Sequence, residues 1–255
     1  MKNLVSVSNL SLTYHSKKGE TEALKDINFN VGEREFISIV GPSGCGKSTI
    51  LSLIAGLLQP SNGEILVAGQ NPDTKNCLTG YMFQKDNLFD WRDIEENVLL
   101  GLQIQKKKTP ENIAYANSLL EKYGLADFKS HKPTELSGGM RQRVALIRTL
   151  ALKPEILLLD EPFSALDYQT RLTLCDDVHE IVSKEKKTVI LVTHDIKEAI
   201  SFSDRVLILS PRPAHIVKEV KVDLGKYGSP FKRRESAEAH KLFEEIWSDI
   251  QYEKM

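Results

Sequence analysis

Short apolar runs recur along the chain at residues 36–40, 156–159 and 188–193. Runs of this length with few polar interruptions are typical of parallel strands that are buried on both faces. Between residues 4 and 31, apolar and polar positions alternate in places. This alternation predicts antiparallel strands, with a loop at the polar stretch 15–22. Shorter strands are expected at 64–69 and 81–84, and a hairpin is expected around residues 210–213.

Apolar positions spaced three and four residues apart predict helices between these strands. After the first run, this spacing is met by Ile50, Leu53, Ile54 and Leu57. Residues 86–150 are mostly helical in pattern, with one face formed by Ile94, Val98, Leu99 and Leu102 and a second helix at 113–123. A terminal helix at 231–251 has one apolar face, made by Leu242, Phe243, Ile246, Trp247 and Ile250, and we expect it to dock on the chain's own core. The mixture of elements predicts an α/β fold.

Composition narrows the class of protein. The 255 residues can bury a full core, and 34 Lys+Arg balance 35 Asp+Glu, so no global positive field points to nucleic acid or anionic lipid. The apolar runs are far shorter than the roughly 20 residues that a membrane span needs. The first residues lack a signal peptide's apolar block, so we expect a cytosolic chain. Cys45, Cys77 and Cys175 lack the spacing of a disulfide framework or a zinc site.

The strongest chemical signal is the segment 41–49, GPSGCGKST, which lies between the first apolar run and the first helical pattern. This strand, loop and helix order is the context that the GxxxxGK[ST] motif requires. Its glycines let backbone N–H groups converge at a helix N-terminus, where phosphate binds. Lys47 can reach the β- and γ-phosphates of a nucleotide, and the Ser48 hydroxyl can ligate Mg²⁺. We therefore predict a phosphate-binding loop comprising Gly41, Pro42, Ser43, Gly44, Cys45, Gly46, Lys47, Ser48 and Thr49.

A second helix start with free N–H groups is expected at LSGGMRQR, residues 136–143. Ser137 can cap this helix, while Gly138 and Gly139 expose the backbone of its first turn. The pattern fits a second anion-binding terminus, and in isolation it fits a plain glycine-rich helix start equally well.

Acidic residues follow the run 156–159. Because ligands of parallel sheets bind at the carboxyl ends of the strands, Asp160 can hold Mg²⁺ there and Glu161 can align an attacking water. The alternative is that two adjacent acids merely end a strand at the surface. His194 follows the run 188–193 at the same predicted edge, although a lone histidine is more often structural.

Tyr14 and Gln84 indicate a function only when they are considered together with these motifs. Tyr14 alone fits an aromatic at a strand end that covers the core, and with the phosphate loop present we expect it to stack on adenine. Gln84 ends a predicted strand, where a glutamine is usually solvated, and it becomes informative if it faces the phosphates.

The chain resembles the ATP-binding subunit of ABC transporters in an ordered set of motifs: Tyr14, GPSGCGKS, Gln84, LSGGMRQR, ILLLDEP, SALD and His194. The likeness runs over about residues 5–222. It implies a P-loop NTPase (RecA-like) core with an antiparallel β subdomain and an α-helical signature subdomain at about 87–150. The ATPase domain would then span 1–224, followed by a C-terminal helical extension at 225–255.

The resemblance also implies a role for each motif residue. Glu161 would be the general base, His194 the γ-phosphate contact, and Gln84 a sensor of Mg²⁺ that links the site to the membrane subunit. Asp160 and Ser48 would hold Mg²⁺ together with Gln84. Two copies would close head to tail around two ATP molecules, with Ser137, Gly138 and Gly139 of each copy contacting the γ-phosphate bound by the other. Asp167 would lie in a loop that crosses this dimer interface.

Segments after Gln84, after the acids and near residue 210 resemble importers of the nitrate, sulfonate and taurine type. We therefore expect the ATPase of an importer for a small anionic solute, held at the cytoplasmic face of the cell membrane by permease subunits. A solute-binding protein would be an indirect partner, and nucleic acid would not be one. The alternatives are an importer of pyrimidine or riboflavin-type precursors, an exporter, and a soluble ATPase of ribosomes or DNA. The single cassette without a heptad array disfavours the last.

The sequence also raises the question of whether the Cys45 thiol is reactive. It lies beside Lys47 and a helix N-terminus, and both favour a thiolate. A reactive thiol that ATP protects from maleimide is one interpretation, and a small inert loop residue is the other.

Overall fold

The computed structural model describes residues 3–17, 19–72, 78–164 and 166–253. Cys77 and Ala165 lie outside these ranges. The strands are β1 (Asn3–Ser16), β2 (Gly19–Gly32), β3 (Phe36–Val40), β4 (Asn62–Val67), β5 (Thr79–Met82), β6 (Ile156–Asp160), β7 (Thr188–Val192), β8 (Arg205–Leu209) and β9 (Ile216–Lys221). The helices are α1 (Lys47–Ile54), α2 (Ile94–Ile104), α3 (Pro110–Lys122), α4 (Gly138–Leu150), α5 (Tyr168–Lys184), α6 (Ile196–Phe202), α7 (Pro230–Arg234) and α8 (Ala237–Tyr252).

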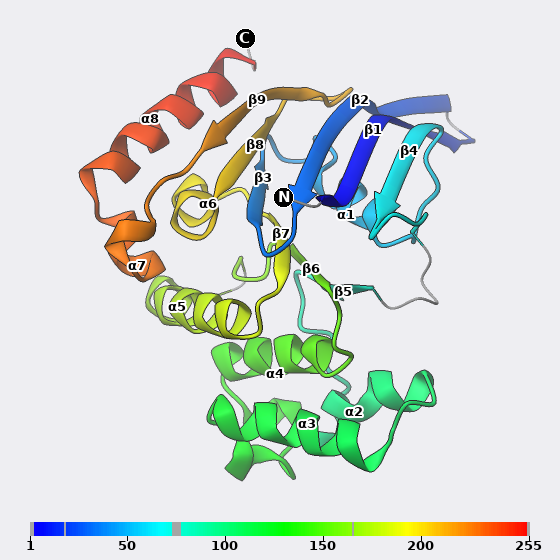
Figure 1. The fold of residues 1–255 in the computed structure, drawn as a ribbon, viewed down its shortest axis with the longest axis vertical. Helices are drawn as coiled ribbons and strands as arrows, with labels where there is room; N and C mark the ends of the chain where they lie inside the picture. The colour runs from blue at the N-terminus through cyan, green and yellow to red at the C-terminus, as the bar shows by residue number, and fades with distance from the viewer. Residues whose placement is uncertain (1–2, 18, 73–77, 165, 254–255) are drawn as a thin grey trace.

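Two sheets organise the chain (Figure 1). The larger has the strand order β5-β6-β7-β3-β8-β9, in which all neighbours are parallel except the antiparallel pair β8 and β9. The smaller has the order β2-β1-β4 and is antiparallel. The α/β class and the antiparallel strands near the amino end are therefore confirmed.

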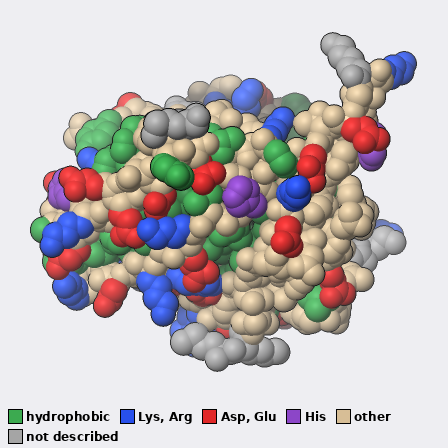
Figure 2. Space-filling view, turned by 90° about the horizontal axis from the view of Figure 1, so that it is seen from above, with side chains coloured by type: hydrophobic (Ala, Val, Ile, Leu, Met, Phe, Trp, Pro, Cys, Tyr) green, Lys and Arg blue, Asp and Glu red, His purple; other side chains and the backbone are tan. Residues whose placement is uncertain are grey.

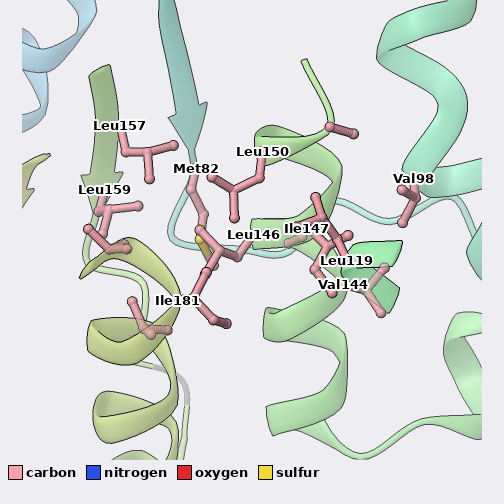
Figure 3. Packing of buried hydrophobic residues seen from close by; sticks show 14 of the residues in the cluster. Met82, Val98, Leu119, Val144, Leu146, Ile147, Leu150, Leu157, Leu159 and Ile181 are labelled. Atoms are coloured by element: carbon pink, nitrogen blue, oxygen red, sulfur yellow. The ribbon is translucent and has the colours of Figure 1, made fainter. Parts of the chain in front are cut away.

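Residues of the central strands alternate between two apolar layers. Leu157 and Leu159 of β6 lie in one layer with α4 and α5, where Figure 3 shows them facing Met82, Leu146 and Ile181. Ile156 and Leu158 face the other layer, with α1 and the small sheet. Burial on both faces explains why these strands contain almost no polar residues.

Helix α1 is shorter than its apolar pattern suggests. Ile50, Leu53 and Ile54 are buried as predicted, but Leu57 is outside the helix and 53% exposed. Gly56, with φ of 73°, follows the helix, and the Leu57 N–H donates to the Ser52 carbonyl, 2.9 Å away. This is the left-handed termination that glycine favours, so the apolar period continues beyond the last helical turn.

The polar stretch 15–22 forms the end of a hairpin and is not an extended loop. His15 pairs with Glu20 and Ser16 with Gly19, so β1 and β2 continue almost to their connection. These paired residues are solvent-exposed. The strands therefore lack the apolar alternation from which they could have been recognised.

Helices α2, α3 and α4 lie together at one end of the molecule, below the large sheet in Figure 1. Their shared core includes Val98, Leu119 and Val144. Asp93 caps α2 in a reciprocal arrangement with Glu96, which satisfies backbone N–H groups at the helix start.

The carboxyl-terminal part forms two helices instead of the single predicted one. Ser236 separates α7 from α8 because its hydroxyl accepts from the Ala239 N–H at 3.1 Å. Ile246 and Ile250 of α8 are buried in a cluster with Val206 and Ile208 of β8, so this helix docks on the chain's own core as expected. Trp247 departs from the predicted apolar face and is 49% exposed, stacked on Phe243.

Acidic and basic side chains lie interspersed on the face shown in Figure 2. Within the described residues, no helix is long and apolar enough to cross a membrane.

Candidate functional site

Functional side chains meet at the carboxyl ends of adjacent parallel strands. The loop 41–46 follows β3, His194 follows β7 and Glu161 follows β6, and these three strands are neighbours in the sheet. They border a cavity of about 550 Å³, lined by Ser43, Gly44, Gly46, Lys47, Ser48, Thr49, Glu161, His194 and Arg212. This location is where open α/β sheets bind ligands.

Close packing fixes the shape of the phosphate loop. Gly46 has a φ of 125°, and a Cβ built there would lie 2.8 Å from Leu24 Cδ2. A Cβ on Gly41 would lie 2.9 Å from the Leu209 carbonyl oxygen. Both positions thus require glycine, one because of its backbone conformation and both because of space.

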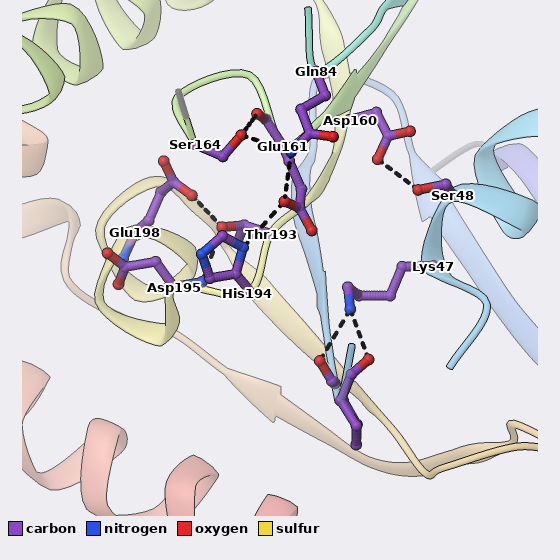
Figure 4. Close-up of polar contacts among 12 residues, drawn as sticks. Lys47, Ser48, Gln84, Asp160, Glu161, Ser164, Thr193, His194, Asp195 and Glu198 are labelled. Carbon is purple, nitrogen blue, oxygen red and sulfur yellow. Dashed lines mark hydrogen bonds and ion pairs between the residues drawn. The ribbon is translucent and has the colours of Figure 1, made fainter. Parts of the chain in front are cut away.

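Lys47 begins α1 and is buried, with its ammonium turned into the loop. Its Nζ donates to the carbonyl oxygens of Gly41 and Pro42, each 3.0 Å away (Figure 4). An ammonium at a helix N-terminus, beside a cavity with glycine backbone on its wall, is suited to bind an anionic group.

Asp160 and Ser48 form an oxygen-rich pair at the same edge. The Ser48 hydroxyl donates to Asp160 Oδ1 at 2.8 Å, and the Tyr81 hydroxyl donates to Oδ2 at 3.0 Å. Burial raises the pKa of Asp160, while these two hydrogen bonds act in the opposite direction. Carboxylate and hydroxyl oxygens are suitable ligands for Mg²⁺.

Glu161 is at the centre of a second polar group, shown in Figure 4. Its Oε2 lies 3.1 Å from His194 Nδ1, and Gln84 Nε2 donates to the same oxygen at 3.4 Å and to Ser164 Oγ at 3.0 Å. Glu161 has a φ of 45°, a left-handed conformation that costs a non-glycine residue about 1 kcal/mol. The sheet edge brings Glu161 and His194 together as the sequence predicted. Gln84, just beyond β5, joins them, a position that the sequence left open.

The buried acid Glu198 contacts Thr193, the residue that precedes His194. Glu198 accepts a hydrogen bond from the Thr193 hydroxyl, and its other carboxyl oxygen has no partner among the described residues. Burial raises the pKa of Glu198 to about 7. Asp195 caps the same helix, α6, and faces the guanidinium groups of Arg171 and Arg234 at 3.8 and 4.0 Å.

The thiolate interpretation of Cys45 is wrong. The side chain is buried, with 2% of its surface exposed, and burial raises the pKa of the thiol despite the nearby charge of Lys47. The loop folds this residue inward, which the sequence could not show. Tyr14 is partly exposed, and its hydroxyl lies 3.2 Å from Thr49 Oγ1, at the end of the loop.

Residues 137–139 do not reach this cavity. Ser137 caps α4 by accepting from the Met140 N–H at 3.3 Å, as predicted, and it lines a separate groove with Gly139 and Thr170. Asp167 caps α5 by accepting from the N–H groups of Gln169 and Thr170. These hydrogen bonds lower the pKa of the Asp167 carboxyl.

Several residues of the site escaped the sequence interpretation. Tyr81 carries no motif of its own, and its hydrogen bond to Asp160 joins two strands. Ser164 begins the SALD segment, but its contact with Gln84 comes from a distant part of the chain and is not encoded by that segment. Arg212 belongs to the SPRP turn between β8 and β9, and only the neighbouring positions of β3 and β8 bring it to the cavity.

Comparisons with known proteins agree with this geometry. A family profile described as ABC transporter matches residues 24–164. The chain is 47% identical over 250 residues to the uncharacterized ABC transporter ATP-binding protein YtlC of Bacillus subtilis (strain 168), covering 97% of this chain and 96% of that protein. It is 37% identical over 247 residues to the taurine import ATP-binding protein TauB of Jannaschia sp. (strain CCS1), covering 96% and 92%.

Among solved structures, the dimeric post-hydrolysis state of the ATP-binding cassette MJ0796 bound to ADP and Pi is similar, with a TM-score of 0.74 and 35% identity. The match covers 86% of this chain and 99% of that one. The likeness includes the P-loop NTPase architecture predicted from the motifs. The chain therefore belongs to the ABC transporter family, as one of its ATP-binding and ATP-hydrolysing domains.

Proposed function

We propose that this ATPase drives a membrane importer, and that the carboxyl edge of its large sheet is the hydrolytic site. The observation that carries the site assignment is the single cavity lined by Lys47, Ser48, Glu161 and His194. In this proposal, Gly41, Pro42, Ser43, Gly44, Cys45, Gly46, Lys47, Ser48 and Thr49 hold the phosphates, and Tyr14 stacks on adenine.

Glu161 is proposed to be the general base. Its carboxylate is aimed at the cavity, and its hydrogen bonds with His194 and Gln84 fix the direction of the free lone pairs. A carboxylate held this way can align a water and accept its proton as that water attacks the γ-phosphate. His194 would then contact the γ-phosphate. Because His194 also contacts Glu161, this contact would couple the position of the phosphate to the position of the base.

Mg²⁺ fits the donor set of this edge. The Ser48 hydroxyl oxygen and Asp160 Oδ1 lie 2.8 Å apart, and in this proposal they would hold the ion together with Gln84. Bound Mg²⁺ would neutralise charge that develops on the phosphate oxygens. Within the described residues, no group of three or more histidine, cysteine or acidic side chains could hold a metal by itself. The remaining ligands would therefore come from phosphate and water, as is usual for Mg²⁺.

We further propose that two copies close head to tail around ATP. The helix start at Ser137, Gly138 and Gly139 presents free backbone N–H groups but lies outside its own cavity. A phosphate held by a second copy would satisfy these groups, and the loop at Asp167 would lie between the copies. ATP can drive closure because it would bind both the cradle of one copy and the α4 terminus of the other.

The transported solute is proposed from relatives. Several are named as taurine import proteins, at 37% to 38% identity. We therefore propose import of a small anionic solute, through permease subunits that hold this chain at the cytoplasmic face of the membrane and receive solute from a binding protein.

The proposed division of the chain follows its helices and clusters. Residues 1–224 would form the ATPase domain, with the α2 to α4 region at about 87–150 as its signature subdomain. Residues 225–255, which contain α7 and α8, would be an extension that docks on β8 and α6.

Glu161→Gln tests the site and the partners together. This variant should bind MgATP normally and lose hydrolysis about a hundredfold or more, because only the base is removed. Tagged protein isolated from solubilised membranes with MgATP should then carry a multi-span permease, with Lys47→Ala as the control that cannot hold nucleotide. Retained hydrolysis would remove Glu161 from the role. Recovery of ribosomal or nucleoid proteins alone would contradict the transporter assignment.

A further inference from the structure

The turn between β8 and β9 carries an arginine that lines the same cavity as Lys47. Arg212 borders this cavity beside Ser43 and Gly44, and its Nη2 would lie 3.9 Å from a Cβ built on Gly44. Strand β8 is the parallel neighbour of β3 on the side away from β7. Arg212 therefore reaches the phosphate loop from the flank opposite to His194.

This turn is held in place from several directions. Proline fixes its own φ and restricts the preceding residue, so Pro211 and Pro213 limit the backbone of Arg212 on both sides. The Ser210 hydroxyl lies 2.9 Å from His215 Nδ1 and accepts from the His215 N–H at 3.0 Å. The Ala214 N–H donates to the Ala23 carbonyl at 3.0 Å, which ties the turn to β2.

The same strand, β2, also supports the phosphate loop. Leu24 of β2 fills the space beside Gly46, as its 2.8 Å approach to a Cβ at that position shows. The arginine turn and the phosphate loop thus share one support, and the guanidinium is presented from a rigid scaffold.

The charge of Arg212 is not neutralised by the described part of the chain. Its side chain is exposed to the cavity and forms no hydrogen bond or ion pair with the described residues. Arg205, at the other end of β8, differs because it pairs with Glu35 at 2.5 Å and Glu219 at 2.8 Å. The strand β8 therefore begins with an arginine that is paired within the fold, and the turn after it carries an arginine that faces the cavity with free donors.

We propose that Arg212 is a further phosphate-binding residue, donating from its guanidinium to phosphate oxygens of the bound nucleotide. The planar group offers paired N–H donors that match two oxygens of a phosphate. The inference rests on the proposed phosphate site and extends it to the SPRP turn, which no motif of the phosphate loop includes. Arg212 would supply a second fixed cation on the flank that Glu161 and His194 do not occupy.

Calorimetric titration of the purified full chain tests this contact. Arg212→Ala should weaken binding of MgADP, and of MgATP in the Glu161→Gln background, about tenfold, as expected for a lost charge-assisted hydrogen bond. Arg212→Lys should recover part of the affinity, because it restores the charge but not the paired donors. In steady-state hydrolysis, KM for ATP should rise while kcat at saturation changes less. Lys221→Ala, which removes an exposed charge from β9 of the same hairpin, should match the parent.

Two controls distinguish misfolding, a wrong role for Arg212 and a wrong phosphate site. Thermal unfolding without nucleotide should give the same Tm for Arg212→Ala and the parent, so a lower affinity cannot be assigned to misfolding. If Lys47→Ala loses binding and Arg212→Ala binds within twofold of the parent, the role of Arg212 is overturned and the phosphate site stands. If Lys47→Ala also binds normally, the phosphate site itself is wrong.

Discussion

At the scale of single residues, Gly46 combines two reasons for lacking a side chain. Its φ of 125° is rare for other residues, and Leu24 occupies the space where a Cβ would lie. We predict that Gly46→Ala destabilises the chain by roughly 1 to 3 kcal/mol and also weakens ATP binding, because the loop must move to relieve both effects. Urea unfolding and nucleotide titration measure the two consequences.

Gly69 provides the matched control for this substitution. It also has a positive φ, of 77°, but a Cβ built there meets nothing within 4 Å, and it does not line the cavity. Gly69→Ala should therefore cost about 1 kcal/mol of backbone strain and leave ATP binding unchanged. Equal effects of the two variants on ATP affinity would contradict the importance of the contact with Leu24.

Glu198 makes the stability of the fold depend on pH. Its pKa is raised from 4.5 to about 7 by burial, although Arg171 and Arg234 act against this shift and Asp195 adds to it. The folded state therefore holds the proton more tightly than the unfolded chain does. The stability that this proton contributes is fully present below about pH 4.5 and is lost as the pH rises through 7.

Glu198→Gln should remove this dependence, because an amide stays neutral and can still accept from Thr193. We predict that the variant is more stable than the parent at pH 8 by roughly 1 to 3 kcal/mol, with a much smaller difference at pH 5. Urea unfolding at the two pH values measures this. Glu244→Gln, an exposed change on α8, should show no such pH-dependent gain.

At the scale of elements, the break between α7 and α8 depends on a cap. The Ser236 hydroxyl accepts from the Ala239 N–H and donates to the Arg233 carbonyl at 2.7 Å, so it satisfies the end of one helix and the start of the next. Ser236→Ala should cost about 1 kcal/mol, which for a chain of this length lowers Tm by about 2 to 4 °C. Ser229 precedes α7 at the N-cap position, but its side chain forms no capping hydrogen bond, so Ser229→Ala should leave Tm almost unchanged.

The elements differ in how fully their sequence predicts them. The central strands were predictable because residues such as Ile156 to Leu159 are buried on both faces and tolerate almost nothing polar. The hairpin at 15–22 was not, since its paired backbone carries exposed side chains with no apolar period. The terminal helix was predicted without its break, because the cap at Ser236 requires a contact that periodicity does not encode.

Some residues of the site can be predicted from local motifs, and others only from the arrangement of the strands in space. Local motifs placed the phosphate loop, Glu161 and His194 at one edge, since strand ends determine where they lie. Arg212 required the order of the strands in the sheet, which sequence alone did not supply. The burial of Cys45 depends on the direction in which the loop folds, and that direction is set by neighbours such as Leu209.

At the scale of the whole molecule, the α4 terminus lies apart from the Lys47 cavity of the same copy. From this we predict how two differently mutated copies behave when they are mixed. If each cavity is completed by Gly138 of a second copy, then a defect in one element should be compensated by a partner that has the other. Gly138→Asp introduces an acid in the first turn of α4, which favours the helix but repels a phosphate. A Cβ at this position approaches only the end of the flexible Leu166 side chain, at 3.1 Å, so the fold should be retained.

Alone, Lys47→Ala and Gly138→Asp should each lack ATP hydrolysis, the first because its cradle fails and the second because it cannot complete its partner's site. A mixed dimer would contain one intact site, formed by the cradle of the Gly138→Asp copy and the α4 terminus of the Lys47→Ala copy. Mixing the two inactive proteins should therefore restore hydrolysis, up to about one quarter of the parent rate if pairing is random and the sites act independently. Mixing either variant with itself at the same concentration is the control. Hydrolysis that stays absent in the mixture, while both variants remain folded and Gly138→Asp still binds ATP, would contradict a site shared between copies.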